Sequence, residues 1–516
     1  MTKKTLRISE QELSFAELRF FLQEEPQLVL DRAIVNKIEQ SHNIIQEIVD
    51  SGKVVYGVNT GFGKFADVRI KKEETAELQR RLVLSHAAGV GAAMPDEIVR
   101  LMMLLKIKNL SQGYSGARLQ VVQMLVDMLN NNIIPVVPQK GSVGASGDLA
   151  PLAHIAAVMI GEGEAFLEND CERKTVSGAE ALKAKKLKPL VLEAKEGLAV
   201  LNGTQAIQAY GILSIIKAES LIKSADIIGA MSLEALLGTL TAFDARIQQI
   251  RNHPGQQAVA QNVRKILQDS PIVESHRFGD NKVQDAYCLR CIPQVHGAVR
   301  DGFEHVKSVF EREMNGVTDN PLVFPDNGDV LSGGNFHGEP VAMAADYLGI
   351  LMSELAGISE RRIEHMLDPA VSEMAGFLTE DGGLNSGFMI AHVTAAALVS
   401  ENKTLVHPSS VDSIPTSANK EDHVSMGTFA ARKALEIVDN VTHVLAIELL
   451  CAAQALDLRA PVEPSPATKG VLDAVRSVVA HWKEDRFMKK DIDRAVELIV
   501  SRAVVAEVEK LFGRLE

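Results

Sequence analysis

A proline-free stretch from residue 416 to residue 460 places the strongest limit on how this chain folds. Within it, mainly apolar side chains recur every three or four positions, the spacing that places them along one face of an α-helix. The positions that share this spacing are Leu435, Val438, Thr442, Leu445, Leu449, Ala452 and Leu456. A long helix with apolar positions on more than one face needs neighbours on several sides. The stretch therefore predicts a bundle of long helices, covered either by the chain's own core or by another subunit.

The rest of the sequence fits a mainly α protein that begins with a small mixed part. Leu348, Leu351, Leu355 and Ile358 repeat the helical spacing further upstream. Residues 1–115 instead mix short apolar segments with glycine-rich loops. We therefore expect a mixed α/β part at 1–115 and a helical bundle part at 116–516. The chain has 516 residues, 46% of them hydrophobic, which is enough to bury a large core.

Charge and cysteine usage narrow the class of function. The formal net charge of -13 argues against nucleic acid or an acidic membrane as a partner. Residues 1–4 are not followed by an apolar signal core, and no uninterrupted apolar run reaches membrane-spanning length, so we expect a cytoplasmic protein. The cysteines, Cys171, Cys288, Cys291 and Cys451, form no disulfide framework, and a single C-x-x-C pair does not complete a zinc site. We expect reduced thiols and no metal.

Residues 141–148, with the sequence Gly-Ser-Val-Gly-Ala-Ser-Gly-Asp, are almost all too small to pack a core. Their glycines lack the spacing of a dinucleotide-binding loop, a P-loop or a nucleophile elbow. If the loop is tightly pinched, the amide of Gly147 can reach the carbonyl of Ala145, on the far side of Ser146. That contact permits chemistry on the backbone itself. Taken alone, however, a loop of small residues is most often a turn.

A helix is predicted directly after this loop. Asp148 is a good N-cap residue. The apolar positions that follow it at helical spacing are Leu149, Leu152, Ile155, Ala156 and Met159. The loop therefore lies at the positive end of a helix, which favours negative charge that develops there.

Six distant motifs accompany the loop. They lie at residues 55–63, 84–89, 201–204, 284–290, 333–339 and 414–423. In order and spacing, these motifs and the loop resemble the ammonia-lyases that carry a methylidene-imidazolone (MIO) group and act on aromatic amino acids. The resemblance spans most of the chain and is strongest to the branch that acts on histidine.

The resemblance implies a fold and a prosthetic group. The family folds as a long-helix bundle of the aspartase-like type. In it an Ala-Ser-Gly triplet cyclises without another enzyme: the glycine amide nitrogen attacks the alanine carbonyl, and two waters leave, one from the serine side chain. By this resemblance Ala145, Ser146 and Gly147 become the MIO, a 5-imidazolinone, and Asp148 assists closure. The family uses no metal and no dissociable cofactor.

The resemblance also assigns roles to residues of the distant motifs. Elimination of ammonia needs a base for a weakly acidic β-proton and an electrophile that improves the leaving group. Tyr56 stands in the position of the base. Arg290 stands where a guanidinium pairs with the substrate carboxylate through two parallel hydrogen bonds. The remaining matches are Asn202, Gln284 and Tyr287, as donors around the MIO and substrate, and Phe336, which would pack the apolar side of the substrate.

His86 and Glu421 determine the predicted substrate. Ser85-His86 matches the histidine-acting members, whereas phenylalanine-acting members resemble Phe-Leu and tyrosine-acting members His-Leu at this place. A histidine and a carboxylate suit an imidazole, which has both a donor and an acceptor. Two roles stay open for Glu421, as a base or as a partner of the substrate's imidazole or amine. Lys420 stands where glutamine is common, and a cation beside Glu421 would draw that carboxylate away or lower its pKa.

The resemblance thus implies deamination of L-histidine to trans-urocanate and ammonia. It also implies a homotetramer with active sites shared between subunits, in which the loop around 402–427 reaches a pocket of a neighbouring subunit. Two alternatives stay open. One is an MIO-dependent tyrosine or phenylalanine ammonia-lyase or aminomutase, and the other is an inactive helical oligomeric scaffold. The Gly-Ser-Ser-x-Met-Pro-x-Lys loop of aspartase- and fumarase-type lyases does not occur in the sequence.

Overall fold

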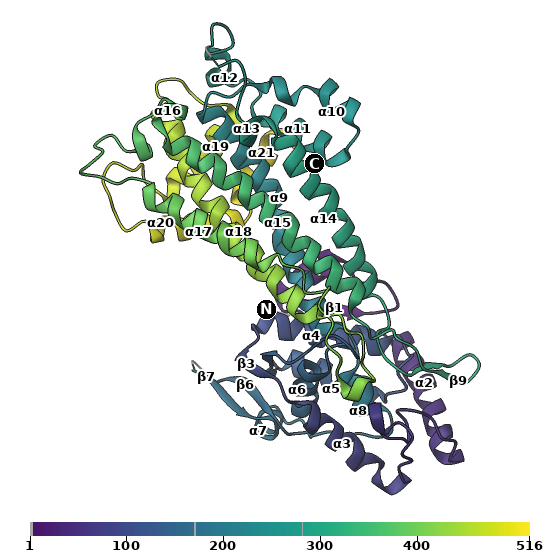
Figure 1. The fold of residues 1–516 in the computed structure, drawn as a ribbon. Helices are drawn as coiled ribbons and strands as arrows, with labels where there is room; N and C mark the ends of the chain where they lie inside the picture. The colour runs from purple at the N-terminus through teal and green to yellow at the C-terminus, as the bar shows by residue number, and fades with distance from the viewer. Residues whose placement is uncertain (1–3, 170–171, 281) are drawn as a thin grey trace. The chain divides into compact units, whose positions relative to one another are not determined.

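The computed structural model describes residues 4–169, 172–280 and 282–516, so that Cys171 lies outside the described residues. The chain divides into two compact units, whose segments can be followed by colour in Figure 1. Unit 1 comprises Met1–Leu213, Lys307–Asp346 and Pro408–Arg432, and unit 2 comprises Ser214–Val306, Tyr347–His407 and Lys433–Glu516. The predicted boundary at residue 115 stays a prediction, and residues 1–115 all belong to unit 1.

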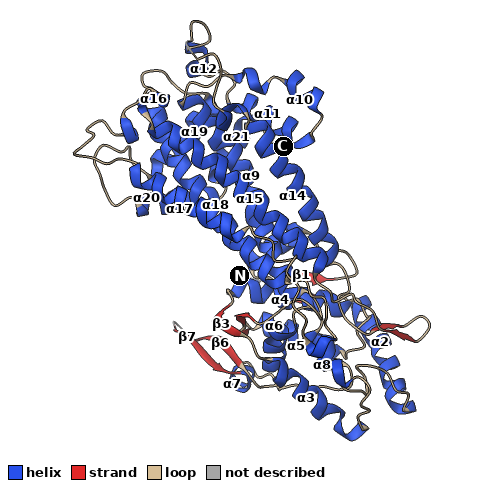
Figure 2. Ribbon diagram, in the orientation of Figure 1, coloured by secondary structure: helices blue, strands red, loops and turns tan. Residues whose placement is uncertain are grey.

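The strands of the described chain, drawn red in Figure 2, all belong to unit 1. They pair in four small sheets: β1 (Thr5–Ile8) with β2 (Gln27–Leu30) in parallel, and the others antiparallel. The antiparallel sheets are β3 (Val90–Ala93) with β5 (Pro138–Lys140), β4 (Ile134–Pro135) with β6 (Glu164–Asn169) and β7 (Glu172–Ser177), and β8 (Leu322–Phe324) with β9 (Asp329–Leu331). The short strands near the start of the chain agree with the mixed α/β part expected there.

Unit 1 contains more helix than strand. Its shorter helices are α1 (Phe15–Glu24), α2 (Arg32–Ser51), α3 (Thr75–His86), α4 (Asp96–Ser111), α5 (Leu119–Asn130), α6 (Leu149–Met159), α7 (Gly178–Ala184) and α8 (Glu196–Leu201). Ser14 and Glu17 begin α1 with a capping box. Helix α4 packs against α2 and α5, and α6 packs against α3 and α8. Every residue of α4 from Ile98 to Ser111 is buried, so the polar side chains of this helix must find partners inside the protein.

The chain passes from one unit to the other at five points, of which four lie within long helices and the fifth follows His407 in a loop. These helices are α9 (Gln205–Ala235), α14 (Ile292–Met314), α15 (Glu339–Leu367) and α18 (Gly427–Leu458). The structure confirms the mainly α class and a long helix within residues 416–460, which begins at Gly427. Among the described helices, α15 and α18 are long and apolar enough to span a membrane. Their apolar windows are 61% and 83% buried inside the fold, which is also typical of core helices.

The regular elements of unit 2 are all helices among its described residues, and loops connect them. Its shorter helices are α10 (Ala245–Arg251), α11 (Pro254–Ile266), α12 (Pro271–Ser275), α13 (Tyr287–Arg290), α16 (Pro369–Ser372), α17 (Met389–Leu405), α19 (Pro466–Val478), α20 (Lys489–Val500) and α21 (Ala503–Phe512). Helix α19 packs against α11, α20 and α21.

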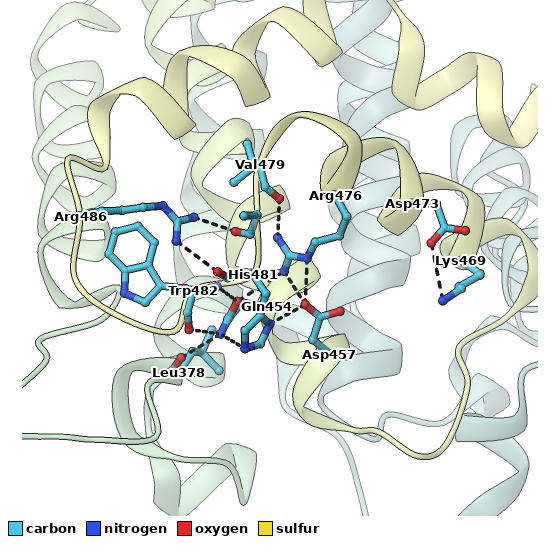
Figure 3. Close-up of polar contacts among 11 residues, drawn as sticks. Leu378, Gln454, Asp457, Lys469, Asp473, Arg476, Val479, His481, Trp482 and Arg486 are labelled. Atoms are coloured by element: carbon cyan, nitrogen blue, oxygen red, sulfur yellow. Dashed lines mark hydrogen bonds and ion pairs between the residues drawn. The ribbon is translucent and has the colours of Figure 1, made fainter.

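A cluster of polar side chains in unit 2, shown in Figure 3, fastens the segment after α19 to the end of α18. Asp457 accepts hydrogen bonds from Nε of Arg476 at 2.8 Å and from Nδ1 of His481 at 2.7 Å. The backbone NH of Trp482 donates to Gln454 Oε1 at 3.0 Å, and Gln454 Nε2 donates to the Trp482 carbonyl at the same distance. The cluster thus joins two segments that no strand pairing connects.

Replacement of Asp457 by alanine leaves Arg476 and His481 without their shared acceptor. We expect it to lower the free energy of unfolding by about 2 kcal/mol, since the carboxylate is mostly buried. A control is Asp473→Ala, because the Lys469–Asp473 ion pair in the same view is exposed to solvent. That change should cost less than about 0.5 kcal/mol.

Urea unfolding monitored by tryptophan fluorescence measures this difference, because Trp482 is the only tryptophan of the chain and lies in the cluster. Equal midpoints for the Asp457 and Asp473 variants would show that the cluster does not stabilise the segment.

Candidate active site

The loop at residues 141–148 is held in a conformation that only glycine adopts easily. Gly141, Gly144 and Gly147 have φ values of 136°, 68° and 73°, all in the left-handed region. A Cβ atom on Gly147 would overlap the carbonyl of Gly203, and one on Gly144 would overlap the hydroxyl of Ser425. The glycines therefore permit both the backbone conformation and the close approach of neighbouring segments.

The turn at residues 202–203, which follows α8, binds one side of the loop at residues 141–148. Gly147 and Gly203 form a parallel β-bridge, and the backbone NH of Asp148 donates to the Gly203 carbonyl at 2.7 Å. The side-chain amide of Asn202 donates to the carbonyl of Ser146 at 3.1 Å. The backbone on either side of Gly147 is thus held, at the Ser146 carbonyl and at the Asp148 amide.

The carboxylate of Asp148 is completely buried and binds the start of α9. One of its oxygens accepts from the backbone NH groups of Ala206, at 2.8 Å, and Ile207, at 2.9 Å. The other accepts from the hydroxyls of Ser142, at 3.0 Å, and Thr428. Burial raises the pKa of this carboxyl, while the hydrogen bonds oppose the shift.

Asp148 occupies the N-cap position of α6, as predicted, but its side chain makes no capping hydrogen bond there. The first-turn NH groups of α9 lie within reach of the carboxylate and bind it instead. The carboxylate thereby ties the loop to a helix that begins far along the chain.

A cavity of about 350 Å³ opens beside the loop, with all its walls in unit 1. The predicted site residues that line it are Tyr56, His86, Ser146, Asn202, Phe336 and Glu421. They come from separate parts of the chain: the turn after α2, the end of α3, the loop before α6, the end of α8, and the loops before α15 and α18. The fold therefore brings together residues from five of the six distant motifs and the small-residue loop.

Glu421 points one carboxylate oxygen at the loop. The hydroxyl of Ser146 donates to Glu421 Oε1 at 2.6 Å. Its other oxygen accepts from the hydroxyls of Thr416, at 2.7 Å, and Ser417, at 3.0 Å. Within the described residues, Lys420 forms no ion pair with Glu421. The expected influence of that lysine on the carboxylate stays a prediction.

His86 ends helix α3 with a defined imidazole. Its Nδ1 lies 2.8 Å from the backbone carbonyl of Leu82, which is an acceptor only, so Nδ1 carries the proton. Burial lowers the pKa of His86 and favours the neutral ring. In that tautomer Nε2 keeps a lone pair and is able to accept a hydrogen bond from a ligand.

Tyr56 and the apolar residues of the cavity form its remaining walls. The Tyr56 hydroxyl accepts from the backbone NH of Gly63 at 3.5 Å. Residues that line the cavity outside the predicted set include Phe62 and Ser417, which lie in motifs singled out above, and Asn320. Asn320 belongs to no such motif, and its only signal in the sequence was the Asn-Pro dipeptide, which marks turns.

Three predicted site residues lie in unit 2 and do not line the unit 1 cavity: Gln284, Tyr287 and Arg290. Gln284 is exposed, and so is Tyr287, at 71% of its surface. The guanidinium of Arg290 lies over the Tyr287 ring, 4.4 Å from its centre, and its buried Nε has no hydrogen-bond partner in the described structure. The roles assigned to these three residues stay predictions.

The described residues contain no group of three or more His, Cys, Asp or Glu side chains placed to hold a metal. Cys288, Cys291 and Cys451 are free thiols. Burial raises the pKa of Cys288 to about 11, which disfavours the thiolate that a metal would bind. The nearby His296 is already bonded to Asp226 at 2.9 Å.

Comparison with known proteins places this arrangement in context. The family model described as aromatic amino acid lyase matches residues 13–477. A histidine ammonia-lyase of Natranaerobius thermophilus is 48% identical over 512 residues, which cover 99% of this chain and 100% of the relative. One from Caldanaerobacter subterraneus is 52% identical over 475 residues, 92% of each chain.

Solved structures show the same architecture. The crystal structure of histidine ammonia-lyase from Trypanosoma cruzi has a TM-score of 0.91 and 42% identity, covering 98% of this chain and 95% of that one. Tyrosine aminomutase from Streptomyces globisporus has a TM-score of 0.91 and 33% identity, covering 98% of both chains.

The contact between Gly147 and Gly203 predicts a measurable penalty for a side chain. Gly147→Ala adds both the strain of a left-handed alanine and the overlap with the Gly203 carbonyl. Gly328→Ala is the matched control, since Gly328 has the same φ of 73° and open space around it. We expect Gly147→Ala to lower the free energy of unfolding by about 1–3 kcal/mol more than the control.

Urea unfolding of the two alanine variants, followed by far-ultraviolet circular dichroism, gives the comparison. Equal losses of stability would mean that the loop and the turn at Gly203 are not in close contact.

Proposed function

The chain belongs to the aromatic amino acid lyase family, and from this premise we propose that it removes ammonia from L-histidine to give trans-urocanate. As a carbon–nitrogen lyase it breaks the Cα–N bond and a Cβ–H bond, and the electron pair of the C–H bond forms the new Cα=Cβ bond. The observation that carries the proposal is the unit 1 cavity. Its walls combine the Ser146 hydroxyl, the Glu421 carboxylate and a neutral His86 imidazole.

Residues 145–147 fit the MIO precursor. Ring closure joins the Gly147 nitrogen to the carbonyl carbon of Ala145. One water carries away that carbonyl oxygen with the protons of the Gly147 and Ser146 nitrogens, and the second carries the Ser146 hydroxyl with its Cα proton. The left-handed backbone of Gly144 and Gly147 and the bonds to the Ser146 carbonyl and the Asp148 amide support this assignment. When formed, the MIO supplies an electrophile for the substrate's amino group.

The side chains that line the cavity suit separate roles in binding the substrate and in the reaction. His86, with its free Nε2 lone pair, suits the N–H of a substrate imidazole. Phe336 packs the apolar part of the substrate, and Tyr56 takes the β-proton as base. The Asn202 amide draws electron density from the Ser146 carbonyl, which strengthens an electrophile built on that residue. Once the serine oxygen has left, the Glu421 carboxylate serves as a base or as a partner for the imidazole or amine.

The unit 2 residues complete the proposal in a larger assembly. We assign the substrate carboxylate to Arg290, with Gln284 and Tyr287 as donors near the MIO. We further propose a cytoplasmic homotetramer with shared active sites and neither a metal nor a dissociable cofactor. The apolar side chains of Ile390 and Val393, exposed at 58% and 54% on α17, support a subunit contact there.

Ser146→Ala should nearly abolish formation of urocanate, followed as an increase in ultraviolet absorbance, because alanine has no hydroxyl to lose. The far-ultraviolet spectrum and unfolding midpoint should stay close to those of the unchanged protein, since the hydroxyl is not part of the loop's backbone contacts. Retained turnover would remove residues 145–147 from the reaction.

His86→Leu should raise the KM for histidine by about 10- to 100-fold, because the substrate imidazole loses a hydrogen-bond partner in a mostly buried place. His253→Leu is the control, since that histidine is exposed and does not line the cavity. A panel of histidine, tyrosine and phenylalanine tests the substrate itself. Cinnamate, coumarate or a β-amino acid as the main product, in place of urocanate, would contradict the proposal.

A further inference from the structure

Helix α4 places Lys106 against the turn at residues 202–203, which binds the loop at residues 141–148. Lys106 is only 2% exposed, and its ammonium donates to the backbone carbonyl of Asn202. Burial lowers the pKa of Lys106 to about 7, an effect that the nearby carboxylates of Asp319 and Asp148 oppose. Burial of an ammonium costs free energy of folding unless hydrogen bonds compensate. The bond from Lys106 to Asn202 is therefore a candidate for a functional role.

Asn202 connects this lysine to the reactive loop. Its carbonyl accepts from Lys106, while its side-chain amide donates to the Ser146 carbonyl at 3.1 Å. The next residue, Gly203, forms the bridge with Gly147 and accepts from the backbone NH of Asp148. The chain of contacts therefore runs from the ammonium through one turn to the Ser146 carbonyl and the Asp148 amide, which lie on either side of Gly147.

We propose that Lys106 is a positioning residue for ring closure: it fixes the turn at residues 202–203 so that the Gly147 nitrogen is held against the Ala145 carbonyl. This inference rests on the MIO proposed above and on the same loss of two waters. Closure of a strained ring is sensitive to small displacements of the reacting atoms. The Lys106 amine donates to the Asn202 carbonyl, and this bond is strongest when the amine is protonated. Without it, the Asn202 carbonyl loses a buried partner, and the turn is free to move.

Lys108 provides a matched control on the same helix. It is also buried, at 5% exposure, and its ammonium donates to the backbone carbonyls of Ser9, at 3.0 Å, and Gln11, at 2.6 Å. These bonds fasten the N-terminal segment and not the turn at residues 202–203. Loss of either lysine removes a buried ammonium from α4, but only Lys106 binds the turn that contacts the loop at residues 141–148.

The test follows the mass of newly made full-length chains over time in cell-free synthesis. Unchanged protein should become lighter by two waters. In Lys106→Met the half-time of this loss should lengthen by about 10-fold or more. Lys108→Met should mature at the rate of the unchanged protein, and Lys106→Arg should recover most of the rate. Thermal unfolding of the variants separates this effect from a general loss of stability.

The outcomes distinguish the two proposals. Unchanged protein that keeps its full sequence mass would contradict the MIO itself. Unchanged protein that loses two waters, with Lys106→Met maturing as fast as Lys108→Met, would overturn the role of Lys106. If Lys106→Met does not fold, Lys106→Gln and Lys108→Gln are compared in the same way. Equal rates of that pair overturn the role, and slower maturation of Lys106→Gln alone supports it.

Discussion

The carbonyl of Gly203 lies so close to Gly147 that the loop has no space for a side chain at that position. Gly203 itself has little more room, because a Cβ atom there would meet Gln205 and Thr318. The loop at residues 141–148 carries few side chains that could hold it by packing, so this backbone contact and the hydrogen bonds of Asp148 decide where it lies. The direction of the Ser146 hydroxyl toward Glu421 and the bond from Asn202 to the Ser146 carbonyl depend on it.

Beneath this contact, unit 1 buries several charges. Lys195 and Asp319 form a fully buried ion pair at 2.8 Å, and Lys106 and Asp148 lie in the same polar region. Buried charge by itself does not identify a functional site, since unit 2 contains the fully buried pair of Arg362 and Glu448. The unit 1 region differs because two of its charged groups act on the loop: Asp148 belongs to it, and Lys106 holds the turn beside it. Groups that reduce stability but position reacting atoms are expected where function and stability compete.

Local sequence patterns predicted the long helix and the small-residue loop, but they did not predict which distant segments these contact. The proline-free stretch predicted the helix that became α18, and the small residues marked the loop. The spacing of residues did not reveal that the Asp148 carboxylate binds the first turn of α9, because that bond joins segments distant in sequence. Lys106 had no signal either, since a lysine in an apolar helix acquires meaning only from the turn that it meets. The family resemblance predicted six of the residues that line the cavity. The roles of Gln284, Tyr287 and Arg290 stay predictions.

The central claim is that residues 145–147 become an electrophile through loss of two waters. Tryptic digestion of the native protein should release the peptide of residues 141–173, because no lysine or arginine lies between Lys140 and Arg173. Tandem mass spectrometry of this peptide should find it lighter by two waters, with the loss confined to residues 145–147. A peptide with the full sequence mass in protein that forms urocanate would contradict the account.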